Sequence, residues 1–266
     1  MRRLAFLLVM TAFLAVPVFA QEPAVTYQMP PQVLADIIDA PPTPGVYLTP
    51  DKEWLLLLER PGNPSIEEVA APELRLAGLR INPRANGPSR SRPLNGLVFQ
   101  NLESGEEVRV TGLPEEPKIT GLSFSPDGEK IAFVVNVDDD LTLWYAEVKD
   151  GKAKRVTQKG LRLNAVYGRP YAWRFDSKSF VARTVPADRG EAPSEPIAPA
   201  GPIVQENLGK KTPARTYQDL LQNHHEEALY DYYNTSQLVL LDLKGTAIKH
   251  GEPDIFRSVT VSPDGE

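Results

Sequence analysis

Five arginines lie close together in one stretch of this sequence. Arg84, Arg90 and Arg92 belong to a loop rich in Pro, Gly and Ser, and Arg75 and Arg80 precede it. A guanidinium can hold a carboxylate through two parallel hydrogen bonds, so we interpret the three loop arginines as a candidate site for an acidic substrate group or an anionic partner. The alternative, which is the more typical of a single loop, is a solvated segment whose arginines pair with acidic residues of the same chain.

Two clusters have the composition of metal ligands but lack the spacing. Asp138-Asp139-Asp140 resembles a calcium cluster without the alternate positions of an EF-hand loop. His224-His225-Glu226-Glu227 lacks the His-Glu-x-x-His spacing that places two imidazoles on one helix face. We interpret the first cluster as a solvated turn and the second as a polar helix surface. The sequence therefore predicts no metal site and no cofactor.

No catalytic constellation is visible in the sequence. There is no Gly-x-Ser-x-Gly elbow, and three histidines provide no convincing Ser/His/Asp set. No phosphate-binding loop or dinucleotide fingerprint is present either. We therefore predict no catalytic residue, and the chain by itself is not expected to be an enzyme.

The element that must position these residues is a repeated β-hairpin. Its clearest copy, Leu122 to Val135, has a half-buried strand, the turn Ser125-Pro126-Asp127-Gly128 and a continuous apolar strand. Proline pre-sets φ at the second turn position and glycine closes the turn, as a type I turn requires. Related copies are Val46 to Leu57 and Tyr171 to Ala182, and a copy at Val259 to Glu266 stops at its turn.

A second hairpin follows each of the first three copies, at Gly96 to Thr111, Leu141 to Thr157 and Gln237 to Lys249. Two hairpins make a four-stranded sheet, and repeated sheets of this kind are typical of a β-propeller. We predict an all-β fold, a β-propeller of four-stranded blades with short helical insertions. About three blades and the start of a fourth form an incomplete ring. A β-sandwich with coincidental turns is the alternative.

The hairpins also set the predicted boundaries. The predicted segments are a signal peptide (1–20), a lead-in with a short helix (21–45), blade 1 (46–114), blade 2 (119–158), blade 3 (170–250, with an insertion at 186–235) and the start of blade 4 (255–266). Helical spacing occurs in Gln32 to Asp39 and Thr216 to Tyr233, and Leu74 to Ile81 resembles an irregular strand. Because propellers typically need about 4–8 blades, we expect this to be the N-terminal part of a longer protein.

Composition and the N-terminus limit the partners and the location. The net charge of −6 argues against nucleic acid or an anionic membrane as the main partner. Met1-Arg2-Arg3, the apolar run Leu4 to Val16 and Val18-Phe19-Ala20 predict a signal peptide cleaved before Gln21, with an uncleaved anchor as the alternative. We expect an exported protein, periplasmic or secreted, without stable membrane insertion after cleavage. The chain has no cysteine, so its stability must come from packing.

Four segments carry a family resemblance: Pro30 to Arg60, Pro72 to Arg92, the Ser125-Pro126-Asp127-Gly128 hairpin and Gly209 to Leu243. Together they resemble the glutamyl endopeptidase branch of the prolyl oligopeptidase family of serine peptidases. The resemblance implies a propeller that caps a C-terminal α/β-hydrolase domain, which holds the Ser, Asp and His and is absent from this chain. It also implies that the propeller admits peptides rather than folded proteins, with cleavage after Glu.

The expected role of this chain is accordingly that of the substrate-gating propeller of an exported serine-type endopeptidase. Its expected partners are peptide substrates and its own hydrolase domain. Under this hypothesis Arg84, Arg90 and Arg92 face the cavity between the domains and help to select peptides with an acidic side chain. A non-catalytic periplasmic propeller that binds a protein partner is the alternative.

Overall fold

The computed structural model describes residues 28–198, 201, 209 and 219–262. The chain divides into two compact units, Met1–Ile38 and Asp39–Glu266. In the first unit the structure describes α2 (Gln32–Ile38), where the sequence predicts a short helix. The predicted signal peptide lies outside the described residues. Within the described ranges, no helix is both long and apolar enough to cross a membrane.

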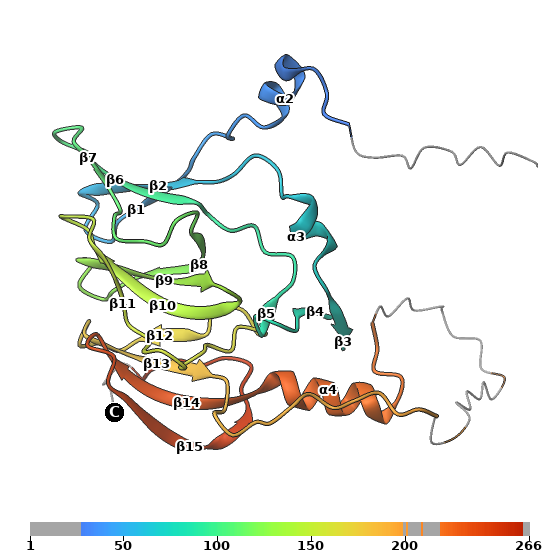
Figure 1. Cartoon of the computed structure of the whole chain (residues 1–266). Coiled ribbons are helices and arrows are strands. Elements are labelled where there is room, and N and C mark those ends of the chain that lie inside the picture. Colours follow the sequence, from blue (N-terminus) through green and yellow to red (C-terminus); the bar gives the residue numbers. More distant parts are fainter. Residues whose placement is uncertain (1–27, 199–200, 202–208, 210–218, 263–266) are drawn as a thin grey trace, which may run out of the picture. The chain divides into compact units, whose positions relative to one another are not determined.

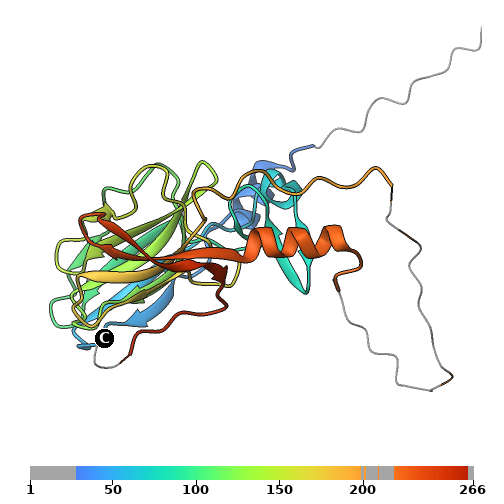
Figure 2. The ribbon, with the colours of Figure 1, turned by 90° about the horizontal axis from the view of Figure 1, so that it is seen from below.

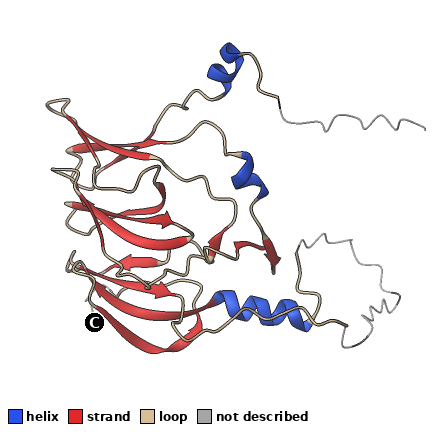
Figure 3. Ribbon diagram, in the orientation of Figure 1, coloured by secondary structure: helices blue, strands red, loops and turns tan. Residues whose placement is uncertain are grey.

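Three four-stranded antiparallel sheets make up most of the second unit and stack one on the next (Figures 1 and 3). Sheet 1 contains β1 (Gly45–Leu48), β2 (Trp54–Glu59), β6 (Gly96–Asn101) and β7 (Glu107–Arg109). Sheet 2 contains β8 (Lys118–Phe124), β9 (Lys130–Val137), β10 (Asp140–Glu147) and β11 (Ala153–Arg155). Sheet 3 contains β12 (Tyr171–Trp173), β13 (Ser179–Thr184), β14 (Thr235–Asp242) and β15 (Ala247–Ile255). These sheets confirm the predicted fold class, an open propeller of four-stranded blades.

Two insertions interrupt the sheets. The first joins β2 to β6 and contains α3 (Ile66–Ala70) and a small sheet of β3 (Leu74–Leu76), β4 (Leu79–Asn82) and β5 (Gly87–Pro88). The prediction of one irregular strand here was wrong, because Ala77 and Gly78 have φ of 49° and 80° and turn the chain into a hairpin. The second insertion joins β13 to β14 and contains α4 (His224–Asn234).

The helix α4 is shorter than the predicted stretch from Thr216, part of which lies outside the described residues. The Asn223 side chain accepts a hydrogen bond from the Glu226 N–H and thereby caps the helix at its first turn. Residues 219–223, which precede His224, are therefore not helical.

The turns of the repeated hairpin have the predicted geometry. In the clearest copy the Gly128 N–H donates to the Ser125 carbonyl at 2.9 Å, and Gly128 has φ of 74°. Lys52 and Ser177 occupy the same turn position in the other two copies, with φ of 62° and 52°. The left-handed conformation therefore persists where the sequence lost its glycine, at some conformational cost.

Sheet 2 contributes to two hydrophobic cores because the side chains of β9 alternate between its faces. Phe133 packs in the core shared with sheet 1, which includes Leu56 and Phe99. Val134 packs in the core shared with sheet 3, which includes Phe180. Phe133 and Phe180 have 0% of their surface exposed. This arrangement explains the continuous apolar run seen in the sequence of β9.

Side chains from sheet 3 also satisfy an irregularity in sheet 2. The pairing of β8 with β9 shifts between Thr120 and Ser123, which displaces backbone carbonyls from the ladder. The Tyr171 hydroxyl lies 2.6 Å from the Gly121 carbonyl and 2.7 Å from the Ala132 carbonyl, and the Trp173 Nε1–H donates to the Ser123 carbonyl at 3.1 Å. Burial raises the pKa of Tyr171, so the hydroxyl stays protonated and can donate.

A fourth sheet does not begin within the described residues. Residues 256–262, which include the stretch Val259 to Ser262 expected to open blade 4, form no strand. Most of the fourth turn copy, residues 263–266, lies outside the described residues.

Candidate functional site

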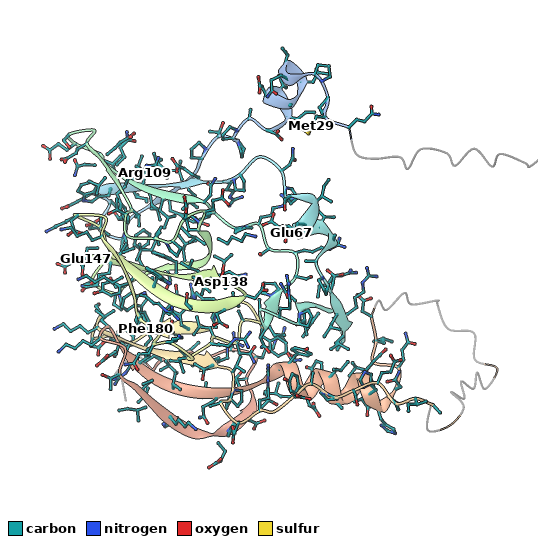
Figure 4. The ribbon with its side chains drawn as sticks, viewed as in Figure 1. Met29, Glu67, Arg109, Asp138, Glu147 and Phe180 are labelled. Carbon is teal, nitrogen blue, oxygen red and sulfur yellow. The ribbon has the colours of Figure 1, made fainter. Side chains whose placement is uncertain are left out.

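Both insertions leave the sheets at the same ends of the strands, on the opposite side from the repeated turns (Figure 1). The β9–β10 turn lies on this side as well. Figure 4 shows its residue Asp138 there, whereas Glu147 at the end of β10 lies on the opposite side. We call this the insertion side and define it by the described residues of 61–95, 138–140 and 185–234. Every polar cluster that the sequence analysis singled out falls on it.

The two insertions pack together although they leave different sheets (Figures 1 and 2). Leu76 and Ile81 of the small sheet share a hydrophobic cluster with Tyr233 of α4. Arg80 forms an ion pair of 3.3 Å with Asp219, and the Gly78 N–H donates to the Asp219 carbonyl at 3.2 Å. The insertions of sheets 1 and 3 thus form one braced layer that bridges sheet 2.

Glu73 organises the arginines of the first insertion. Its carboxylate accepts hydrogen bonds from Ser89 Oγ at 2.5 Å, Arg80 Nη1 at 2.8 Å, and Arg75 Nε and Arg90 Nε at 3.1 Å. The side chain of Glu73 is only 11% exposed. The hydrogen bond from Ser89, supported by those from Arg80 and Arg75, lowers the pKa of Glu73 to about 2. Much of the positive charge in this segment is therefore neutralised internally.

The three predicted site residues lie in different surroundings and are not brought together on one group. Arg84 Nε lies 3.2 Å from Asp139 Oδ2, and Arg90 pairs with Glu73. Arg92 is exposed, and no described carboxylate lies within 4.0 Å of it. A substrate carboxylate would have to displace an existing partner from Arg84 or Arg90, so their binding role stays a prediction.

The candidate metal clusters make other contacts. Asp139 pairs with Arg84, and Asp140 Oδ1 lies 2.6 Å from Arg162 Nε. His224 Nδ1 lies 2.8 Å from Glu227 Oε2 on the exposed surface of α4. Among the described residues, no three His, Asp or Glu side chains are grouped as a metal ion requires.

Sequence reasoning missed two further arginines, Arg183 near the end of β13 and Arg189 in the second insertion. Arg183 is 2% exposed, and its guanidinium donates to four backbone carbonyls, those of Phe256, Arg257, Tyr167 and Arg169. Burial lowers the pKa of Arg183. Two of these carbonyls precede β12 in the sequence and two follow β15, so Arg183 has a structural role in joining the segments that enter and leave sheet 3.

Arg189 is half-buried between the two insertions. Its Nη1 donates to Asn86 Oδ1 at 2.5 Å and to the Tyr232 carbonyl at 3.3 Å. Its guanidinium carbon lies 4.0 Å from the centre of the Tyr232 ring, a cation–π contact. The sequence signal here was weak, because Arg189 stands in a Pro/Ala/Gly stretch without periodicity.

No protein-family model matches this sequence. It is 36% identical over 250 residues to a protein of Oryza sativa subsp. japonica named probable glutamyl endopeptidase, chloroplastic, covering 90% of this chain and 26% of that protein. A protein of Arabidopsis thaliana with the same name is 36% identical over 249 residues, with the same coverage. A solved acylaminoacyl peptidase is similar at 15% identity and a TM-score of 0.34, over 78% of this chain and 25% of that chain. The chain thus spans about a quarter of the length of these relatives.

Proposed function

We propose that this chain, which belongs by sequence to the glutamyl endopeptidase branch of the prolyl oligopeptidase family, is the substrate-gating propeller of an exported serine-type endopeptidase that cleaves after glutamate. The 36% identity over 250 residues confirms the family resemblance of the four segments and is the observation that carries the proposal. The gating role, the cleavage after glutamate and the export through a leader of residues 1–20 are proposals.

The braced insertion side supports a gating role. An entrance that selects substrates by size needs a constant width. Loops that move independently at the strand ends would not keep that width constant. Here the ion pair of Arg80 with Asp219 and the shared hydrophobic cluster hold the two insertions together across sheet 2. We propose that this layer limits entry to extended peptides.

The first test compares two proteins. We expect the 266-residue chain to hydrolyse no peptide and to react with no fluorophosphonate, because it holds no nucleophile elbow. We expect the gene product that includes whatever follows Glu266 in the same reading frame to react with the probe and to cleave after Glu. The exported form should begin at Gln21. Specific labelling of the 266-residue chain, or a longer product without cleavage after Glu, would contradict the proposal.

The same assay tests the three loop arginines, which we propose as contacts for acidic peptides. Arg92 is exposed, and an exposed ion pair contributes about 1 kcal/mol or less, so Arg92→Ala should lower the Glu/Gln ratio of kcat/KM by at most about fivefold. Arg84→Ala and Arg90→Ala should have smaller effects, since Asp139 and Glu73 already hold these side chains. An unchanged ratio in all three variants would favour the solvated-loop interpretation.

A further inference from the structure

Arg189 carries a charge that the described part of the chain does not balance. Three neighbouring arginines each have a carboxylate partner: Arg84 pairs with Asp139, Arg90 with Glu73 and Arg162 with Asp140. Arg92, which is exposed to solvent, has none within the described residues. No described carboxylate lies within 4.0 Å of Arg189. Charged groups that leave water are normally paired, because desolvation without a counter-charge is costly. Burial indeed lowers the pKa of Arg189.

The geometry around Arg189 fixes the guanidinium and leaves one of its edges open. Stacking on Tyr232 and the hydrogen bond to Asn86 hold its plane and its Nη1 group. The Tyr232 hydroxyl also donates to the Gly190 carbonyl at 3.0 Å, which anchors the adjoining loop. Within the described residues, no carbonyl or carboxylate oxygen accepts a hydrogen bond from Nε or Nη2 of Arg189, and the Tyr232 side chain is their polar neighbour. These two groups form the edge that a carboxylate binds side-on.

We propose that Arg189 binds the carboxylate of an acidic peptide side chain through Nε and Nη2. The site draws on both insertions, because the first supplies Asn86 and the second supplies Arg189 and Tyr232. A guanidinium already held in place loses little freedom when it binds, and its partial burial reduces screening by solvent. The choice of a peptide as the ligand rests on the proposed function. Arg189 would then be a specificity-determining residue rather than a catalytic one.

The test is binding to the whole 266-residue chain, measured by NMR titration with a matched pair of peptides that differ only in Glu or Gln. We expect about tenfold tighter binding of the Glu peptide to the wild type. Arg189→Gln should abolish this preference. Arg189→Lys should retain part of it, because lysine keeps the charge but lacks the planar pair of donors. Arg60→Gln removes the same charge at an exposed position and should leave the preference unchanged.

Three results would overturn the inference: no peptide-induced shift at millimolar concentration, equal affinities for Glu and Gln peptides in the wild type, or an unchanged preference in Arg189→Gln. If Arg189→Gln does not fold, the Arg189→Lys variant decides, since a full preference in that variant excludes recognition by the guanidinium edge. Because binding is measured without hydrolysis, the result is independent of the peptidase assay. Carboxylate binding without cleavage after Glu in the longer gene product would contradict the proposed function alone.

Discussion

Replacing Phe133 with alanine is expected to lower the free energy of unfolding by about 3–5 kcal/mol. Phe133 is 0% exposed and packs with Leu56 and Phe99 in the core between sheets 1 and 2. The substitution removes an aromatic ring from a closed interface and leaves a cavity that neighbouring strands cannot fill without breaking their ladders. Urea denaturation followed by circular dichroism measures the effect, with the slope of the transition checked for a change.

The control for this prediction is Phe175→Ala. Phe175 is 53% exposed and stands at the second position of the third repeated turn, so its replacement should change stability by about 0.5 kcal/mol or less. Comparing the two substitutions therefore distinguishes destabilisation by lost packing between the sheets from destabilisation by the loss of any aromatic ring. Similar destabilisation by both substitutions would contradict the description of sheet 2 as the shared centre of two cores.

The repeated hairpins could be predicted from the sequence because their determinants are local. The turn at Ser125 to Gly128 and the apolar run of β9 lie within a few residues of each other. The residue types of a turn and the pattern of apolar residues along a strand can both be recognised over such short distances. The degenerate third copy was also recognised, although Ser177 replaces glycine, because the flanking strands retain their pattern.

The braced layer could not be predicted in the same way. Arg189 reaches Asn86 across 103 residues and the Tyr232 carbonyl across 43, and Arg80 reaches Asp219 across 139. No periodic signal marks such pairs, since the partners lie far apart in the sequence and Arg189 and Asp219 lie outside the helices and strands. The sequence therefore drew attention to the exposed arginines of the loop, two of which the fold pairs with carboxylates, and passed over Arg189.

The stability of the small sheet β3–β5 is expected to depend on pH through Glu73. The folded-state pKa of Glu73, about 2, lies below the ordinary value of 4.5. A depressed folded-state pKa means that the ionised carboxylate stabilises the fold. This contribution is fully present above about pH 4.5, falls as the pH drops from 4.5 towards 2, and is absent below that range.

The ionised Glu73 is expected to stabilise the small sheet by about 1–2 kcal/mol, because its hydrogen-bonding partners are only partly shielded from solvent. Arg80, Arg75 and Arg90 are 34%, 55% and 70% exposed. Hydrogen-exchange protection of the amides in β3 and β4, corrected for the intrinsic effect of pH, should therefore decrease about five- to thirtyfold between pH 5 and pH 2.

Glu73→Gln isolates the role of this carboxylate from that of other acids that titrate in the same range. At pH 5 the variant should already show reduced protection in β3 and β4, and its further loss on acidification should be smaller than in the wild type. Glu67→Gln, at an exposed position in the first turn of α3 (Figure 4), is the control and should follow the wild type. Parallel pH profiles for the wild type and Glu73→Gln would contradict a stabilising role of the Glu73 charge. The stability of the small sheet would then come from the hydrophobic cluster of Leu76, Ile81 and Tyr233.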